Sequence, residues 1–371
     1  MGAMAAPATT RPLASLTDPL RRQSGLVTAV VLVVIMELLA YREGINAFGV
    51  LVSGLALGSL YALVALGYTM VYGIIELINF AHGDVFAFGA FASLALMEKM
   101  DVNMADVNSQ YDGGTHTVNI LAIHFSAQGM WLAIWTVAVA MIFAAVVCAV
   151  LGVLIERIAY RPLRNAPRLA PLITAIGMSF IIENALLQWR GGANLSYPSI
   201  VPLTHPSAFG ATFNNVDVIA LVIALIIMVL LDRFVNGTTM GKAMRAVAQD
   251  REAAQMMGIN VDRIISVTFI VGSALAGAGA VVYGMDLGSV GYNMGFTLGL
   301  YAFTAAVLGG IGNIRGAMVG GLLIGIVQQF VNGLDNGGGT AWSDPVVFAV
   351  LVMVLVFRPA GLFGTQVPEK V

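Results

Sequence analysis

Long apolar runs, separated by short polar connections, cover most of this 371-residue chain. An α-helix needs about 20 residues to cross the hydrocarbon core of a bilayer, and most of the runs approach or exceed that length. The pattern therefore predicts an all-α, polytopic transmembrane bundle of ten spans. The predicted spans are Leu26–Tyr41, Phe48–Ile74, Leu77–Met97, Met130–Ile155, Leu169–Trp189, Val218–Phe234, Ile264–Tyr283, Phe296–Ile311, Ala317–Leu334 and Pro345–Phe357.

The start of the chain leaves two alternatives open. Residues 1–24 are polar and Pro-containing, with no apolar period, and we interpret them as a disordered cytoplasmic tail. The apolar run that follows is short, and a basic lead before a short apolar core is also typical of a signal peptide. Glu37 within the run, and the lack of an Ala-x-Ala cleavage pattern after it, favour a retained helix. Residues 25–371 are then a single transmembrane domain.

The distribution of basic residues predicts the orientation, because Lys and Arg are retained on the cytoplasmic side of short loops. Of the 18 Lys and Arg residues, only Arg42, Lys99 and Arg190 fall in segments that the ten-span pattern places outside. Both termini are therefore expected in the cytoplasm. The outside segments, Glu98–Gly129 and Arg190–Asp217, are rich in Asn, Asp, Gly, Ser and Pro, which predicts loops.

Composition supports the assignment to membrane proteins and gives no sign of a nucleic-acid partner, a catalytic site or a metal site. Hydrophobic residues make up 58% of the chain and charged residues only 10%, against about 25% charged in an ordinary soluble domain. A net charge of −2 gives no reason to expect a nucleic-acid partner. The single cysteine, Cys148, lies in an apolar run and is expected to be buried and inert. We find no catalytic motif, no intact phosphate loop and no histidine spacing suited to a metal, so no catalytic site, metal site or cofactor is predicted.

Few ionisable groups lie within the predicted spans. Burying a charged side chain in the bilayer costs free energy, so each of these groups is a candidate for a functional role. Asn79, His82 and Asp84 stand with two glycines at the start of one span. They suit either a broken helix with a close backbone approach or a capped cytoplasmic turn. Glu183 lies two thirds along another span, where it either reaches the outer interface, pairs with a neighbouring helix, or serves transport. These four residues are our candidates for a translocation path.

A basic segment, ERIAYRPLRNAPR, follows the fourth predicted span. Its arginines suit anchoring at lipid headgroups on the cytoplasmic side, which we favour over a role in docking a partner. Pro162, Pro167 and Pro171 predict a stiff, non-helical loop.

The longest polar interruption is Gly241–Arg263, within a predicted cytoplasmic loop at residues 235–263. As a helix it would place Ala243, Val247, Ala254 and Met257 on one face and would direct Arg245, Gln249 and Glu252 away from it. Asp250 falls on the apolar face of that continuous helix. We therefore expect the helix to break near Asp250, giving two short pieces, with Asp250 capping the second.

Within this interruption, Glu252-Ala253-Ala254-x-x-x-Gly258 resembles the EAA motif of bacterial importer permeases, a cytoplasmic element that docks on an ATP-hydrolysing subunit. The resemblance extends from about Leu51 to the carboxyl terminus, through blocks such as GLALGSLYALVALGYTMVYGIIELINFAHGDV and FTAAVLGGIGNIRGAMVGGLLIGI. These blocks are similar to the LivH-type permease subunit of branched-chain amino acid ABC importers. The chain before Gly49 is additional, and the segment Asp101–Gln128 is longer than usual for that family.

The resemblance implies a non-catalytic subunit in the inner membrane of a bacterium. Its partners would be two ATP-binding subunits, a second homologous permease and an external substrate-binding protein, and its substrates branched-chain or related amino acids. The residues expected to couple it to the ATPase are Gly241, Arg245, Asp250, Glu252, Ala253, Ala254 and Gly258. A urea or amide permease of the same class, and a stand-alone ion-coupled carrier, remain alternatives.

Overall fold

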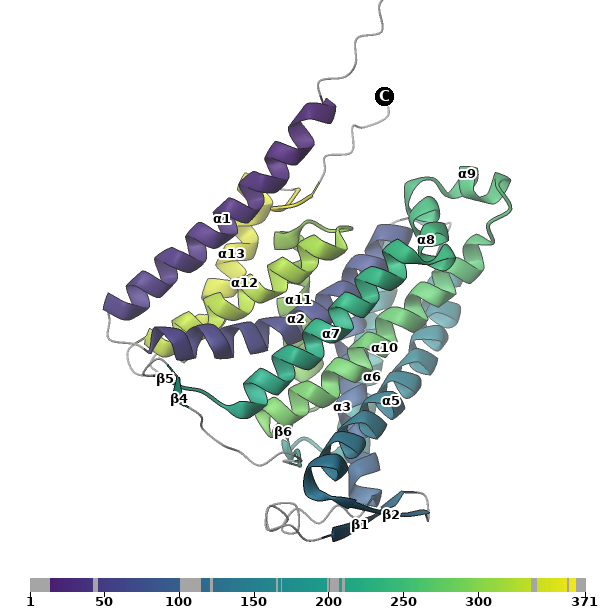
Figure 1. Ribbon diagram of the computed structural model, residues 1–371. Helices are drawn as coiled ribbons and strands as arrows, with labels where there is room; N and C mark the ends of the chain where they lie inside the picture. Colours follow the sequence, from purple (N-terminus) through teal and green to yellow (C-terminus); the bar gives the residue numbers. More distant parts are fainter. Residues whose placement is uncertain are drawn as a thin grey trace, which may run out of the picture.

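The computed structural model describes residues 14–42, 46–100, 115–120, 123–164, 166–167, 169–198, 200, 207–208, 211–334, 339–358 and 360–364. Long helices make up most of this part of the chain (Figure 1). They are α1 (Ala14–Arg42), α2 (Ala47–Ile75), α3 (His82–Lys99), α5 (Gly129–Ile155), α6 (Leu169–Arg190), α7 (Asn215–Gly237), α10 (Val261–Leu287), α11 (Met294–Gly309), α12 (Ile314–Gly333) and α13 (Thr340–Phe357). The predicted all-α fold is confirmed.

Each predicted span overlaps one of these long helices, but the predicted span Leu77–Met97 begins before α3, because residues 77–81 are not helical. Among the described residues, seven helices are long and apolar enough to cross a membrane, namely α2, α5 with its extension to Leu163, α6, α7, α10, α12 and α13. Shorter apolar stretches lie in α1 and α11. α3 has 18 residues and includes Asp84, Glu98 and Lys99, which lower its hydropathy. The count of ten spans stays a prediction.

Short elements connect the long helices. The π-helix η2 (Glu156–Tyr160) and the 3₁₀ turn η3 (Arg161–Leu163) continue α5, while α8 (Thr239–Gln249) and α9 (Arg251–Met256) separate α7 from α10. Three two-stranded antiparallel ladders pair β1 (Thr115–Ile120) with β2 (Ile123–Gln128), β3 (Leu195–Ser196) with β6 (Ser289–Val290), and β4 (Ser207–Ala208) with β5 (Ala211–Thr212). In Figure 1, α8 and α9 lie at one end of the bundle, and β1 and β2 lie at the other.

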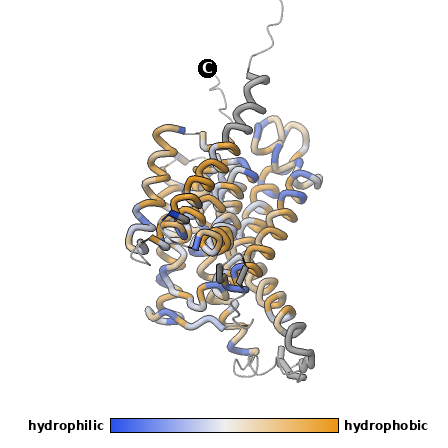
Figure 2. Tube along the Cα trace, turned by 60° about the vertical axis from the view of Figure 1, so that its left-hand side comes forward, coloured by the Kyte–Doolittle hydropathy of each residue, from blue (hydrophilic) through white to orange (hydrophobic). Residues whose placement is uncertain are grey.

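The centre of the bundle is built around α2, α10 and α12, whose apolar segments are 61%, 61% and 56% buried. α2 crosses α12 at a glycine seam, where a Cβ on Gly58 would lie only 2.7 Å from the Gly321 carbonyl oxygen. Small residues allow this because membrane helices associate through close packing rather than through the hydrophobic effect. Figure 2 shows hydrophobic residues along most of the length of the helices, with hydrophilic residues gathered mainly toward their ends.

Three local predictions were wrong. α1 begins at Ala14, so residues 14–24 of the expected disordered tail are helical; residues 1–13 lie outside the described residues. Part of the predicted loop before α5 forms the β1–β2 hairpin, because short β-prone runs such as Thr-His-Thr-Val can pair across a turn. The arginine segment is helical through Leu163, since Pro162 occupies the first turn of η3, where its missing N–H costs nothing.

Candidate functional site

A sharp corner joins α7 to α8. Thr238 is extended (φ −98°, ψ 160°), and its Oγ1 accepts a hydrogen bond from the Gly241 N–H at 3.0 Å. Gly241 is buried, and a Cβ there would overlap the Val235 carbonyl, so glycine is needed for α8 to begin so close to α7. The Arg245 guanidinium donates to the same carbonyl and, at 3.1 Å, to Asn236 Oδ1. Gly241 and Arg245 therefore fix the corner.

The polar helix breaks at Asp250. This residue has an extended backbone (φ −159°, ψ 112°) and separates α8 from α9. Its Oδ1 accepts a hydrogen bond from the Ala253 N–H at 3.0 Å, which satisfies one of the free donors in the first turn of α9. The prediction of two short helices with Asp250 capping the second is confirmed.

Gly258 turns the chain back toward the bundle. It lies in the left-handed region (φ +82°), where glycine carries no steric penalty. The following Ile259 N–H donates to the Ala254 carbonyl at 3.0 Å, closing the end of α9. Asn260 then caps α10 by accepting from the Arg263 N–H at 3.0 Å. Gly258 therefore ends α9 and lets the chain enter α10.

The two faces of α8 and α9 follow the prediction, with one exception. Val247 and Ala254 are buried, and the predicted polar residues are exposed, namely Arg245, Gln249 and Glu252. Met257 was expected on the apolar face, but its exposed fraction is 83%, and that of Met256 is 82%. The break at Asp250 changes the rotational phase of the chain, so that the face of α8 does not continue along α9.

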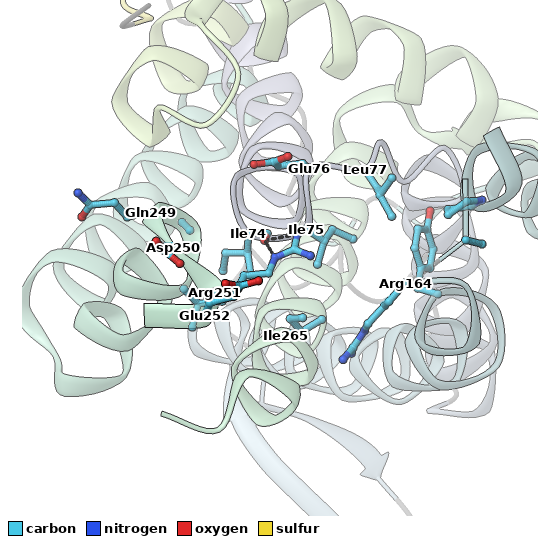
Figure 3. Close-up of a pocket in the computed structure, with 15 residues that line it drawn as sticks. Ile74, Ile75, Glu76, Leu77, Arg164, Gln249, Asp250, Arg251, Glu252 and Ile265 are labelled. Carbon is cyan, nitrogen blue, oxygen red and sulfur yellow. Dashed lines mark hydrogen bonds between the residues drawn. The ribbon is translucent and has the colours of Figure 1, made fainter. Parts of the chain in front are cut away.

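A cleft of about 510 Å³ lies beneath α8 and α9. Its walls come from the end of α2, the segment that follows α2, the turn between α5 and α6, and the start of α9 (Figure 3). Charged side chains of both signs line it, including Glu76, Arg164 and Glu252. Its lining therefore combines charged groups of both signs with apolar residues.

Arg251 joins α9 to the end of α2 across this cleft. Its Nε and Nη2 both donate to the Ile74 carbonyl, at 3.2 and 2.8 Å (Figure 3). α2 ends one residue later, and Glu76 adopts a left-handed conformation (φ 56°). The last carbonyls of a helix lack partners within the helix and carry partial negative charge, so a guanidinium is favourable there. Sequence reasoning treated Arg251 only as one more cytoplasmic charge, because nothing in its position along the chain indicates α2.

A second group of charges fixes the start of α10 to η2 and η3. Arg161 Nη2 lies 2.7 Å from Asp262 Oδ2, while Arg164 pairs with both Asp262 and the fully buried Glu156. Ser266 donates to Glu156 Oε2 at 3.0 Å. Arg161 and Arg164 thus bind protein carboxylates, a role that anchoring at lipid headgroups did not predict.

In the non-helical segment between α2 and α3, Asn79 and Ala81 are buried, whereas Glu76 is exposed. Asn79 Oδ1 accepts a hydrogen bond from the Tyr160 hydroxyl at 3.1 Å, and Tyr160 also lines the cleft. A Cβ on Gly83 would lie 2.8 Å from the Gly299 Cα. The close backbone approach is therefore present, whereas no side chain caps the start of α3, so the polar residues do not form the expected capped turn.

His82 and Asp84 lie deeper than Asn79, and both are fully enclosed. The His82 imidazole occupies the space left by Gly67 of α2, where any Cβ would overlap the ring. Asp84 accepts a hydrogen bond from Ser179 of α6, while its Oδ1 has no hydrogen-bond partner among the described residues. Glu183 follows Ser179 by one helical turn, is half-buried, and is close enough to Asp84 for their charges to interact.

The predicted site residues therefore form two separate groups. The coupling residues surround α8 and α9, and the path candidates lie at the start of α3 and on α6. Tyr160 connects the groups, since it contacts Asn79 and lines the cleft. Tyr160, Ser179 and Arg251 were missed by sequence reasoning, because a lone Tyr, Ser or Arg has no distinguishing pattern.

No group of three or more His, Cys, Asp or Glu side chains among the described residues is arranged to hold a metal ion. His205 lies outside the described residues. The absence of a metal or cofactor therefore stays a prediction.

Residues 50–355 match the family model described as "Branched-chain amino acid transport system / permease component". This range contains the whole of α8, α9 and the cleft beneath them. The chain belongs to this permease family. It is accordingly a multi-pass membrane permease subunit of an ABC importer, a class whose members work with other transporter subunits.

Relatives of this permease support the same assignment. The chain is 39% identical to the high-affinity branched-chain amino acid transport system permease protein BraD of Pseudomonas aeruginosa, over 86% of this chain and 97% of the relative. It is 38% identical to the LivH permease protein of Escherichia coli K12, over 86% and 96% of the two chains. The nucleoside ABC transporter permease protein NupB of Lactococcus lactis is 30% identical over 42% of each chain. No solved structure matches this permease.

Asp250→Ala should loosen α9, because the Ala253 N–H loses its acceptor. Loss of such a cap costs about 1 kcal/mol, which corresponds to roughly fivefold more of the open form. Limited trypsin digestion at Arg251 should accelerate by about that factor. Asp250→Asn keeps an oxygen acceptor and should cleave at the wild-type rate. Equal rates for the Ala and Asn variants would contradict the capping role.

Arg251→Ala should release α9 from α2, because the Ile74 carbonyl loses both donated hydrogen bonds. A hydrogen bond to a charged group contributes about 1.5–3 kcal/mol, and partial exposure of Arg251 reduces that value. We expect the amides of α9 to exchange with solvent about tenfold faster by hydrogen-exchange mass spectrometry. Arg263→Ala, at an exposed position in the same region, is the matched control and should leave the rate unchanged.

Proposed function

We propose that this permease moves branched-chain or related amino acids into a bacterial cell, driven by ATP hydrolysis in partner subunits. An external binding protein delivers the substrate, two ATP-binding subunits supply energy, and a second homologous permease completes the path. The chain itself catalyses no reaction. Residues 25–371 form one transmembrane domain in the inner membrane, with both termini and the loop 235–263 in the cytoplasm.

One observation carries the coupling role, namely the broken helix α8–α9 that is attached to two central helices. Arg251 contacts the end of α2, and the turn at Gly258 leads directly into α10. Glu252, Met256 and Met257 are exposed side chains of this element, and Glu252 also lines the cleft. An ATPase subunit that binds these residues and then moves would displace α2 and α10 together.

The arrangement of the ends supports the orientation. In Figure 1, the start of α1 lies toward the same end of the bundle as α8 and α9, and the β1–β2 hairpin lies at the opposite end. Arg161, Arg164 and Arg251 also belong to the α8–α9 end. We assign this end to the cytoplasm and the hairpin end to the face that receives the binding protein.

Motion of α8 and α9 would open the path by parting helices that meet at glycines. α3 approaches α11 at Gly83 and α10 at Gly89, where the backbones pass with little side-chain interlocking. Asn79, Asp84 and Glu183 would then be exposed to the substrate, and His82 would lose its enclosure beside Gly67. Such rocking of helix groups about a central path is the usual basis of alternating access.

Glu252→Lys or Gly258→Asp should leave the permease inserted and assembled while uptake becomes uncoupled from ATP. The first reverses an exposed charge on the docking face, and the second introduces a side chain at a left-handed backbone position. Substrate uptake and ATP hydrolysis would be measured in vesicles that contain the full complex. Wild-type uptake in both variants would contradict the coupling role. Uptake that an uncoupler abolishes and that is indifferent to ATP would instead favour an ion-coupled carrier.

Substrate class is tested separately, by competition for uptake in the full complex. The relatives that match most of this chain are named for branched-chain amino acids. Leucine and valine should therefore inhibit uptake of labelled leucine, whereas glutamate, proline and urea should have smaller effects. Inhibition by urea alone would overturn the amino-acid assignment and favour the urea or amide alternative.

A further inference from the structure

α6 packs on the bundle through one face only. α6 contacts α3 and η2, and its buried residues recur every three or four positions, namely Pro171, Ala175, Ser179, Ile182 and Leu186. The opposite face is exposed over the same length, with Gly177, Ile181, Asn184 and Gln188 at spacings of four, three and four. This face is called the α6 outer face below.

The α6 outer face differs from the outer faces of three other spans. Between Ile134 and Leu154 of α5, between Val218 and Leu230 of α7, and between Pro345 and Phe357 of α13, every exposed residue is apolar. Those faces suit lipid. The α6 outer face instead has the amide of Asn184 within an apolar helix that is long enough to cross a membrane.

Only one of the two polar atoms of the Asn184 side-chain amide has a hydrogen-bond partner within α6. Its Nδ2 donates to the Phe180 carbonyl at 2.8 Å, and no described residue donates a hydrogen bond to its Oδ1. Hydrocarbon offers no donor, so polar side chains in spans face protein or water. About two helical turns before Asn184, Gly177 has no neighbouring heavy atom within 4 Å of a placed Cβ, which leaves room for a close helix.

The α6 outer face adjoins the residues that are candidates for the translocation path. Glu183 lies between the buried face and the α6 outer face, is half-buried, and is one helical turn from Ser179, which donates to Asp84. A polypeptide that covered the outer face would therefore border the Asp84–Ser179 contact. An intramembrane carboxylate at that border requires a donor or a water-filled cavity, and a subunit seam can provide either.

We propose that the α6 outer face is the contact surface for the second permease subunit, which presents a membrane helix with a small residue opposite Gly177 and a hydrogen-bond donor to Asn184. The path candidates Asp84 and Glu183 then lie beside the seam between the two permeases. This inference rests on the proposed function, because it requires a second, related permease subunit.

Photocrosslinking in membranes that contain the full complex tests the contact. The photoreactive residue p-benzoylphenylalanine would replace Asn184, or Ile181 on the same face, and Val222 of α7 serves as the matched control. Val222 is exposed in an apolar surrounding and lies at a similar distance from the end of its helix as Asn184 does from Arg190. We expect an adduct with the second permease from position 184 or 181, and none from position 222.

Three outcomes would overturn the inference. These are adducts with lipid alone at both 184 and 181, an equal adduct with the second permease at 222, or an adduct between two copies of this chain. A probe at Met257, which is 83% exposed, separates the inference from the proposed function. An adduct with an ATPase subunit at 257, together with only lipid adducts at 184 and 181, would leave the proposed function intact and reject the α6 contact. No ATPase adduct at 257 would count against the proposed function itself.

Discussion

Close backbone contact between α2 and α12 is the constraint on which the rest of the bundle depends. A bilayer supplies little hydrophobic drive for helices to associate, because lipid tails are as apolar as the side chains. The helices must instead gain packing contacts, which requires small residues where their axes cross. Gly58 and Gly321 meet this need at the centre of the bundle. With α2 held there, α10, α7 and α11 can pack around it.

α2 also connects the two ends of the molecule. Near its start, Ser53 donates to Asp217 of α7 at 2.5 Å. Near its end, the Ile74 carbonyl accepts both hydrogen bonds from Arg251. Since membrane helices are stiff over this length, a displacement of α9 that Arg251 transmits to α2 would be carried along the bundle. This would be a mechanical reason for placing α9, which we propose as the docking helix, beside the end of the central helix α2.

The α8–α9 element is attached by few contacts, in contrast to the glycine seams. Its buried side chains are small in number, with Val247 of α8 and Ala254 of α9 among them. Caps at Thr238, Asp250 and Asn260 define where each helix begins. Segments with few buried apolar contacts open at low free-energy cost, and moving elements are drawn from such segments. Well-defined helix ends with light packing suit a part that must move as a unit.

The sequence alone determined the class of fold, the positions of the long helices and the break at Asp250. These features depend on local physics: apolar length in a bilayer, and the ability of a short carboxylate to cap the helix that follows it. The tertiary structure decided which residues meet. Arg251 and Ile74 are 177 positions apart, and Asp84 and Ser179 are 95 apart, so no local pattern could pair them. Met257 was misplaced for a related reason, since the direction of α9 depends on the turn before it and on the surface where it rests.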